Sequence, residues 1–340
     1  MIDRKKLAGL KAAVLCGGPG VEREVSLNSG QAVYRALHEA GFRVEKAVVP
    51  ETGYKAFLEE LDCQVAVMML HGEFGEDGRS QEVLERRGIA FTGSDSRTCG
   101  LAMDKNATKL LFRRCGVPTP DWVVLDDTAS ALAAVKKAGM GAPLVVKPNA
   151  RGSSVGVTIV RDLATLPEAV EKALAVDSLV LAERFVAGRE LTVGWLDGKI
   201  LPIIELAPDG TFYDYHAKYL SDKTEYRCPA SLAYTELSAV RSVAENILRN
   251  IPLRDLARID IMLGSYGPQA LEVNTSPGFT SHSLVPLAAS RAGIEMRELC
   301  SRLVEMAARR GGLVGGDAGW DSLELFHDAP AIAYSKQRTA

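Results

Sequence analysis

The sequence predicts an α/β protein that begins with a parallel sheet and continues into an α+β part rich in antiparallel strands. At about 150 residues per domain, a chain of 340 residues has room for two or three domains. Its first hundred residues alternate between apolar strand-like runs, glycine loops and helical segments, which is typical of a parallel sheet. From residue 191 onward, hairpin patterns replace this alternation.

The N-terminal strands are short apolar runs that end in glycine-rich loops. Residues 11–16 (KAAVLC) predict a buried strand closed by the turn 17–20 (GGPG), and residues 29–40 predict a helix that stops at a glycine. A second run, 65–70, precedes the polar loop 71–78 (HGEFGEDG). The functional loops of a parallel sheet lie at the carboxyl ends of its strands, which is where both glycine loops fall.

The middle of the chain has a different pattern, in which strands flank the glycine-rich loop 148–154 (PNARGSS). A strand–loop–strand arrangement is not the strand-to-helix setting of a P-loop, and no GxxxxGK[ST] motif occurs, so a Walker A site is excluded. The elements expected here are helices over 105–115 and 167–175 and strands over 144–147, 155–160 and 179–186.

Hairpins dominate the last part of the chain. The strongest signal covers 192–206, where Asp197-Gly198 joins two strand patterns. Residues 214–229 are polar and without periodicity, so we expect a long loop, which a compact domain rarely carries without a purpose. An amphipathic helix is predicted over 237–250, and a tail follows Gly311-Gly312, where the periodicity ends.

Composition excludes several classes of protein. Apolar residues make up 47% and charged residues 24% of the chain, which excludes global disorder. The net charge is −3 and no basic aromatic stretch occurs, so we expect no nucleic-acid partner. The longest apolar run, 65–70, is far short of the about 18 residues of a membrane span, and the apolar stretch near the N-terminus is too short for a signal peptide. We therefore expect a cytoplasmic protein. The six cysteines form no CxxC pair and predict reduced thiols.

The most informative segment is a predicted hairpin over 258–274. A symmetrical hairpin sets Asp260 opposite Glu272 and Arg258 opposite Asn274, with all four side chains on one face. The core-facing side is expected to carry Ile259, Ile261, Leu271 and Val273. Facing carboxylates need a positive charge between them. One interpretation is a surface pair neutralised by Arg258 or a lysine. The other is a magnesium site completed by substrate phosphate, because Asn274 adds a third oxygen ligand, and this favours a nucleotide site.

The loop that follows, 275–283 (TSPGFTSHS), precedes a helical run from Leu284. Ser281 and Ser283 stand where this helix begins, so one of them is expected to cap it. Hydroxyls and a bare glycine amide at a helix N-terminus also suit a carboxylate or phosphate. Both interpretations remain open at this point.

These residues occur in motifs that resemble those of the D-alanine–D-alanine ligases of the ATP-grasp superfamily. The resemblance is collinear over residues 11–310, and its specificity comes from the order of the whole set. The motifs are GG at 17–18, EREVS at 22–26, HG and GEDG within 71–78, MDK at 103–105, KP and GSSVG within 147–156, FYDY and AKY within 212–219, RID at 258–260, and EVNTSPG and SHS within 272–283.

The resemblance implies an ATP-grasp fold in which a parallel-sheet, Rossmann-like domain precedes the α+β part that binds ATP. We expect an N-terminal domain over 1–103 that binds the first D-alanine. A central ATP-grasp subdomain with the glycine-rich loop would cover 104–190, and a C-terminal subdomain with lid and metal site would cover 191–312. Residues 313–340 would form a tail without an assigned role.

The resemblance also implies a reaction in two steps. ATP phosphorylates the carboxylate of one D-alanine, and the amine of a second D-alanine attacks the acyl phosphate, giving D-alanyl-D-alanine for peptidoglycan synthesis, ADP and phosphate. By the same resemblance, ATP is bound by Lys105, Lys147, Glu183, Glu190 and Lys218, while Asp260, Glu272 and Asn274 bind two Mg²⁺ or Mn²⁺ ions. The family is commonly homodimeric, so a homodimer is expected.

The D-alanine site is assigned in the same way. The resemblance gives catalytic roles to Glu22, Ser153, Tyr219, Arg258 and Gly278, and substrate-binding roles to His71, Ser281 and Ser283. Glu22 would anchor the ammonium group of the first D-alanine, and Arg258 with the Gly278 amide would stabilise the tetrahedral oxyanion. The two serines would bind the carboxylate of the second D-alanine.

Two alternatives remain open. The first is a ligase that uses D-lactate or D-serine as acceptor. Relatives that make depsipeptides tend to carry Phe at the lid tyrosine, so Tyr219 favours an amine acceptor without separating D-serine from D-alanine. The second is a non-catalytic nucleotide-binding module, which would be expected to have lost parts of a chemical set that is complete here. Residues 214–229 are the natural lid, since an acyl phosphate must be kept from water. Arg79 and Arg151 depart from residues that are frequent in the family.

Overall fold

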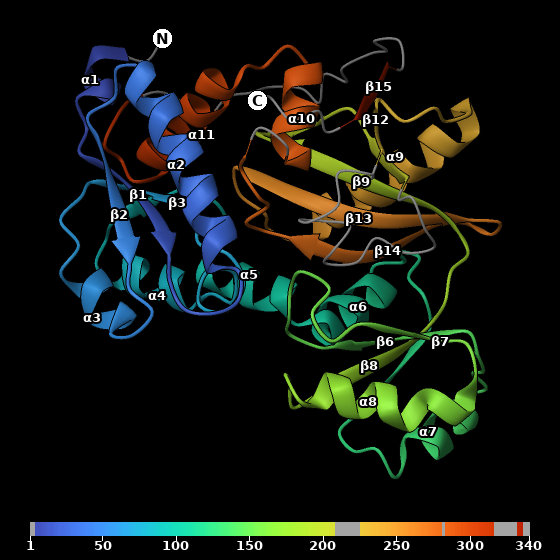
Figure 1. Cartoon of the computed structure of the whole chain (residues 1–340). Coiled ribbons are helices and arrows are strands. Elements are labelled where there is room, and N and C mark those ends of the chain that lie inside the picture. Colours follow the sequence, from blue (N-terminus) through green and yellow to red (C-terminus); the bar gives the residue numbers. More distant parts are fainter. Residues whose placement is uncertain (1–3, 208–224, 281–282, 316–331, 336–340) are drawn as a thin grey trace.

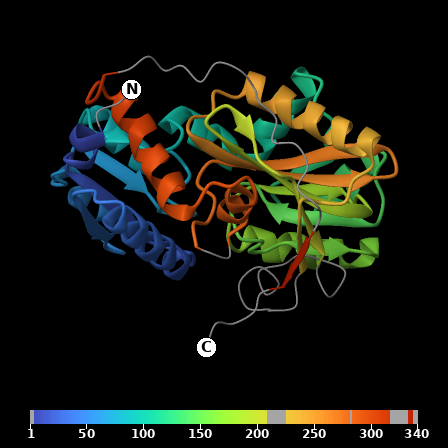
Figure 2. The same ribbon diagram turned by 90° about the horizontal axis from the view of Figure 1, so that it is seen from above.

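The computed structural model describes residues 4–207, 225–280, 283–315 and 332–335. Within these ranges the strands form three sheets, each with its own helices (Figure 1). Seen from above, the parallel N-terminal sheet lies beside the sheet that the chain forms after residue 187 (Figure 2). None of the helices in these ranges has the length and apolar character that a membrane span requires.

The N-terminal unit is a four-stranded parallel sheet in the order β2-β1-β3-β4, which confirms the parallel sheet predicted from the strand–loop–helix alternation. Its strands are β1 (Ala12–Gly17), β2 (Val44–Val49), β3 (Val65–Met68) and β4 (Ala90–Phe91). The helices of this part are α1 (Arg4–Ala8), α2 (Arg23–Glu39), α3 (Tyr54–Glu59), α4 (Arg79–Arg86) and α5 (Ser96–Met103).

Helix α2 packs directly on β1. A Cβ at Gly30 would lie 2.4 Å from the Cβ of Cys16, so only glycine allows this approach. The helix begins at Arg23, six residues before the predicted start at residue 29. The pattern missed this first part because Ser26, a polar residue, faces the sheet, where its hydroxyl accepts from Gly17 N–H and donates to the Met69 carbonyl.

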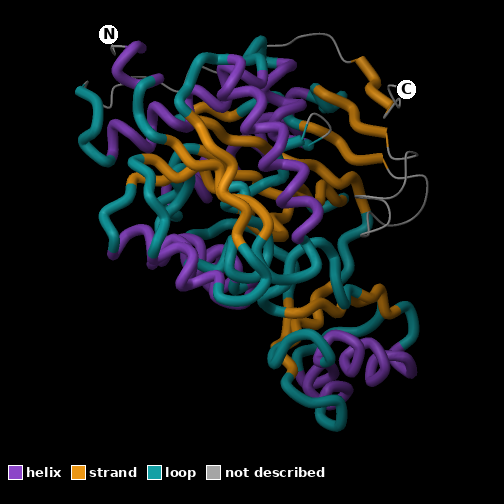
Figure 3. Tube along the Cα trace, turned by 60° about the vertical axis from the view of Figure 1, so that its left-hand side comes forward, coloured by secondary structure: helices purple, strands orange, loops and turns teal. Residues whose placement is uncertain are grey.

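The second unit is an antiparallel sheet in the order β5-β8-β6-β7, which projects from the rest of the molecule as a separate lobe (Figure 3). Helices α7 and α8 cover one face and enclose their own apolar cluster. The predicted elements are confirmed to within a few residues. They are α6 (Lys105–Arg114), β6 (Leu144–Pro148), β7 (Thr158–Val160), α8 (Leu166–Leu174) and β8 (Val180–Arg184). The structure adds β5 (Trp122–Leu125), α7 (Ala131–Lys137) and the short 3-10 helix η1 (Leu163–Thr165), which were not predicted.

The third sheet has the order β14-β13-β9-β11-β12-β15, with β10 paired to β9. Its elements are β9 (Gly188–Leu196), β10 (Lys199–Ile200), β11 (Ile204–Ala207), β12 (Glu225–Cys228), α9 (Tyr234–Asn250), β13 (Leu256–Gly264), β14 (Gly267–Asn274), α10 (Leu284–Arg291), α11 (Met296–Arg310) and β15 (Ile332–Ser335). The hairpin at Asp197-Gly198 is confirmed, since Lys199 pairs with Leu196. Helix α9 lies against β14 and β13, and α10 lies against β9.

One expectation is corrected at β12. We predicted a loop over 214–229, but residues 225–228 are a strand that pairs with β11 and β15. Tyr226 and Cys228, two residues apart on one face of this strand, are buried. The polar composition of the segment did not predict this burial. Residues 208–224, which contain the rest of the predicted lid, lie outside the described residues.

Helix α11 packs the C-terminal part of the chain against the N-terminal unit. It packs against α2 and β3, and one apolar cluster runs from the N-terminal sheet through α10 and α11. Arg310 at its end forms a bidentate ion pair with buried Asp255, at 2.6 and 2.9 Å, and Asp255 also accepts from Gly93 N–H at 2.7 Å. The domain limits at 103, 190 and 312 stay a prediction.

Candidate active site

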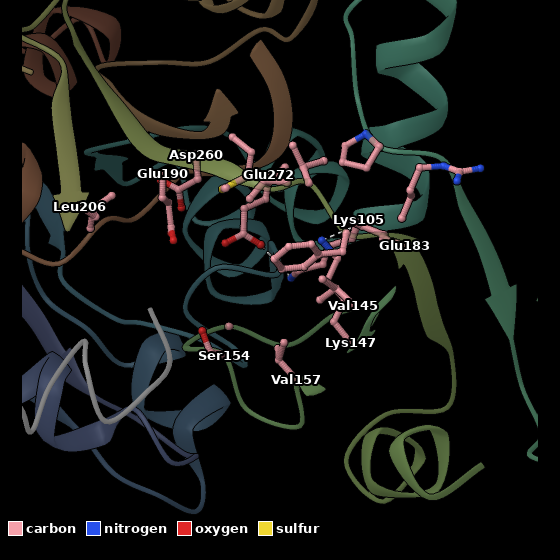
Figure 4. Close-up of a pocket in the computed structure, with 18 of the residues that line it drawn as sticks. Lys105, Val145, Lys147, Ser154, Val157, Glu183, Glu190, Leu206, Asp260 and Glu272 are labelled. Atoms are coloured by element: carbon pink, nitrogen blue, oxygen red, sulfur yellow. Dashed lines mark ion pairs between the residues drawn. The ribbon is translucent and has the colours of Figure 1, made fainter. Parts of the chain in front are cut away.

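A cavity of about 360 Å³ lies between the second and third sheets. Figure 4 shows Glu190, Asp260 and Glu272 close together on one side, with Ser154 and Val157 across from them. A second cavity of about 330 Å³, against the N-terminal sheet, shares Arg151 and Gly152 with the first. The predicted site residues that line the first cavity are Lys105, Lys147, Ser153, Glu183, Glu190, Asp260 and Glu272, and those that line the second are Glu22 and His71.

The hairpin β13–β14 has the predicted register at its functional end. Arg258 pairs with Asn274 and Asp260 with Glu272. Beyond Asp260 the register shifts by one residue, because Leu271 is an extra residue that forms a β-bulge. This corrects one expectation: Leu271 lines the cavity instead of the core, and Ala270 is the buried residue opposite Ile261.

Asp260 is the centre of a polar cluster on this face. The Arg258 guanidinium donates to both of its oxygens at 2.9 and 2.8 Å, and the Asn274 amide donates at 3.1 Å. The Thr192 hydroxyl of β9 donates to it as well. The facing carboxylates have the counter-charges that the surface-pair interpretation expected, Arg258 at Asp260 and Lys105 at 3.4 Å from Glu272, but the two carboxylate side chains are only 11% and 25% exposed. Thr192 was missed because the pairing of β9 with β13 cannot be recognised from local sequence.

The same face suits a hard cation. Asp260, Glu272 and Asn274 supply carboxylate and amide oxygens, the donors that Mg²⁺ and Mn²⁺ take from proteins. Within the described ranges, no group of three or more His, Cys, Asp or Glu residues is placed to enclose a metal by itself. A cation held here would therefore take its other ligands from substrate phosphate or water, as Mg²⁺ does in nucleotide sites.

Three lysines of the central lobe face or approach the first cavity. Lys105, at the start of α6, lies 3.4 Å from Glu272 and donates to the Arg151 carbonyl at 2.7 Å. Lys147 on β6 lies 2.6 Å from Glu183 Oε1, and Lys109 lies 3.3 Å from the same oxygen. Sequence reasoning missed Lys109. The only signal was its place one helical turn after Lys105, which also fits an ordinary surface lysine.

Burial would raise the pKa of Glu183, but the charges of Lys147 and Lys109 outweigh this and hold that pKa below its usual value. Burial also lowers the pKa of Lys109 to about 8, although Glu183 opposes the shift. The three side chains thus form a buried cluster in which each charge depends on its neighbours.

The glycine-rich loop closes over Glu22. Ser153, in a left-handed conformation at φ +52°, donates its hydroxyl hydrogen bond to Glu22. A Cβ at Gly152 would lie 3.1 Å from Glu22 Oε2, and one at Gly72 would lie 2.0 Å from the same atom. Two loops from separate sheets therefore meet at a single carboxylate, and at Gly72, where φ is +63°, the close approach requires glycine.

His71 is 6% exposed and connects the N-terminal sheet to the loop after β14. Its Nδ1 lies 3.0 Å from the Ser276 carbonyl and its Nε2 lies 3.1 Å from the Ser29 hydroxyl. That hydroxyl accepts from Phe279 N–H at 3.1 Å, which fixes the loop next to Gly278. Ser29 was not predicted to take part.

Ser283 occupies the N-cap position of α10, as predicted, but its hydroxyl makes no capping bond to the helix. It accepts instead from Thr280 N–H at 3.0 Å and lies next to Gly278, where a Cβ would be 3.0 Å from its oxygen. Ser281, Lys218 and Tyr219 lie outside the described residues.

Comparisons with known proteins show the family to which the chain belongs. Residues 111–305 match the family model described as D-ala D-ala ligase C-terminus. The chain is 40% identical over 299 residues to the D-alanine–D-alanine ligase of Methylacidiphilum infernorum, covering 88% of this chain and 95% of that one. It is 42% identical to that of Actinobacillus pleuropneumoniae, covering 88% and 98%.

Solved structures give the same result. The D-alanine–D-alanine ligase of Bacillus anthracis in complex with ATP has a TM-score of 0.79 and 33% identity, covering 89% of this chain and 98% of that one. The VanG D-Ala:D-Ser ligase of Enterococcus faecalis has a TM-score of 0.75 and 26% identity, covering 88% and 99%. The predicted α/β, ATP-grasp fold is thereby confirmed. With a family match over more than half its length and relatives at 40% identity or more, the chain is an enzyme that belongs to the D-alanine–D-alanine ligase family.

Proposed function

We propose that this enzyme uses ATP to join two D-alanine molecules to D-alanyl-D-alanine, with release of ADP and phosphate. The dipeptide serves the synthesis of peptidoglycan precursors. The observation that carries the proposal is the pair of adjoining cavities. One is lined by lysines and acidic residues suited to a metal-bound nucleotide, and the other contains Glu22. They meet at Arg151 and Gly152, so a carboxylate held beside Glu22 lies next to the nucleotide site.

The first cavity suits ATP in several respects. Val145, Leu206 and Met262 offer apolar surface for a flat base, with Glu183 and Glu190 for the adenine and ribose. Lys105 and Lys147 would bind phosphate oxygens, with Lys218 from the predicted lid. Asp260, Glu272 and Asn274 would hold two Mg²⁺ or Mn²⁺ ions, which neutralise phosphate charge when bound.

The second cavity suits a small amino acid. Glu22, held by Ser153, would bind the ammonium group of the first D-alanine, with His71 beside it and Tyr219 closing the network. The carboxylate of the first D-alanine then attacks the γ-phosphorus of ATP, and the D-alanyl phosphate forms as ADP leaves. Because this intermediate hydrolyses in water, the lid over 214–229 would close before the second step.

The second step is attack by the amine of the second D-alanine. Ser281 and Ser283 would bind its carboxylate at the start of α10, where the helix dipole favours an anion. Arg258 and the Gly278 amide would stabilise the oxyanion of the tetrahedral intermediate, which collapses with loss of phosphate. We also propose that the enzyme acts in the cytoplasm and forms a homodimer.

D-Alanine is favoured over other acceptors. The curated relatives at 40 to 42% identity are named D-alanine–D-alanine ligases. Tyr219 also favours an amine over D-lactate.

The test is phosphate release with Mg²⁺, ATP and D-alanine, alone or with D-serine or D-lactate, and with L-alanine as control. Products are identified by mass. We expect release with D-alanine alone and a product of the dipeptide mass. A mixed product in preference to the dipeptide would refute the acceptor assignment, and no release with any substrate would refute the ligase activity of this chain.

A further inference from the structure

The buried cluster of Lys109, Glu183 and Lys147 contains two cations directed at one carboxylate oxygen. Lys147 Nζ lies 2.6 Å and Lys109 Nζ 3.3 Å from Glu183 Oε1. Both contacts are ion pairs to the same oxygen. One lysine would be enough to neutralise one carboxylate, and the second therefore needs an explanation.

The two lysines differ in their access to the cavity. Lys147 lines it and retains 9% side-chain exposure, so it can turn toward a ligand. Lys109 is fully buried and is not among the lining residues. It donates to the Thr119 hydroxyl at 2.7 Å and lies 5.0 Å from the centre of the Trp122 ring. Thr119 in turn donates to the Ala270 carbonyl of β14, so Lys109 is tied to two neighbouring elements.

This difference matters when a nucleotide binds. If Lys147 moves to a phosphate, Glu183 loses its closest counter-ion while it remains almost wholly buried. A buried carboxylate without a partner is strongly disfavoured, so Glu183 would compete with the phosphate for Lys147. Lys109 removes this competition because it stays beside Glu183.

We propose that Lys109 is a positioning residue, the permanent counter-ion of Glu183, and that it releases Lys147 to bind the phosphates of ATP. The proposal rests on the proposed function in two points, ATP as the ligand of the first cavity and Lys147 as a ligand of its phosphates. Lys109 touches neither substrate nor metal in this scheme and acts entirely through the other two side chains.

The test is the binding of ATP and of adenosine, measured by calorimetry without D-alanine, so that no ligation is required. The dissociation constant of adenosine divided by that of ATP reports the contribution of the phosphates, and this ratio falls when ATP binds more weakly. In Lys109→Met, Lys147 is the cation that remains beside Glu183 among the described residues, and we expect ATP to bind about 10-fold or more weakly while adenosine affinity stays within about threefold. Lys137→Met, at the exposed end of α7, is the matched control and should leave the ratio unchanged.

A double variant separates this role from a structural one. Lys109→Met/Glu183→Gln removes one positive and one negative charge together, and the charge that remains is Lys147, which lines the cavity and retains 9% side-chain exposure. In it Lys147 has no carboxylate to neutralise, so we expect the ratio to return to within about threefold of wild type. Two results in Lys109→Met overturn the inference: an equal loss of adenosine and ATP affinity, or an unchanged ATP affinity. Lys147→Met serves as the reference for loss of the phosphate contact. A double-variant ratio as low as the ratio of Lys147→Met also overturns the inference. Failure of the ligase reaction in the wild type would instead refute the proposed function.

Discussion

Substituting Gly72 by alanine should disable the D-alanine site through Glu22. Gly72 has φ +63°, and an added Cβ would lie 2.0 Å from Glu22 Oε2. Real Cβ contacts are not shorter than 3.0 Å, so the carboxylate must move by at least 1.0 Å (3.0 minus 2.0). A misplacement of about 1 Å in a binding group costs on the order of 10²-fold in rate. The left-handed conformation adds about 1–2 kcal/mol of destabilisation.

The assay is phosphate release at saturating ATP as a function of D-alanine concentration. For Gly72→Ala we expect kcat/KM for D-alanine to fall by about 10²-fold, with ATP affinity within about twofold of wild type. Gly88→Ala is the control, because Gly88 has nearly the same φ of +66° and nothing within 4 Å of the added Cβ. It should cost similar stability and leave kcat/KM unchanged.

The result that refutes this reasoning is a folded Gly72→Ala enzyme with the D-alanine dependence of the wild type. It would mean that Glu22 does not stay against Gly72 during turnover, or that it does not bind the ammonium group. A loss of activity in Gly88→Ala equal to that in Gly72→Ala would show that backbone strain alone explains the effect.

Three further predictions test other parts of the site and fold. Arg258→Ala should lower kcat by about 10²–10³-fold while ATP still binds, and unchanged turnover would remove Arg258 from the oxyanion role. Arg310→Met should lower the free energy of unfolding in urea by about 2 kcal/mol, less than the about 3–5 kcal/mol of a fully buried pair, because Arg310 is 32% exposed while Asp255 is 2% exposed. An unchanged urea midpoint would contradict this. Burial raises the pKa of Cys228 and of Cys300 to about 12, so neither thiol should react with a disulfide reagent in the native enzyme at pH 8. Fast labelling of either, located by mass spectrometry, would contradict it.

Local patterns predicted those features that depend on neighbours in the chain. The pairing of Asp260 with Glu272 follows from the two-residue period of strands and a short turn. The bulge at Leu271 did not follow, because one extra residue in a strand leaves no local signal in its hydrophobic pattern. The inward-facing Ser26 likewise hid the first turns of α2, since a buried polar residue resembles an exposed one in a pattern of hydrophobicity.

The sequence by itself determined the α/β class, most elements and, through the resemblance, the family and the residue types of the site. Only the tertiary structure decided which side chains meet. Ser153 and Glu22 are 131 residues apart and Thr192 and Asp260 are 68 apart, yet each pair is joined by a hydrogen bond. Lys109 has the sequence context of a surface lysine, and it becomes a buried counter-ion only because β6 and β8 bring Lys147 and Glu183 to α6. Such contacts form when distant elements pack together and exclude water, and this is also what gives their charges and hydrogen bonds their strength.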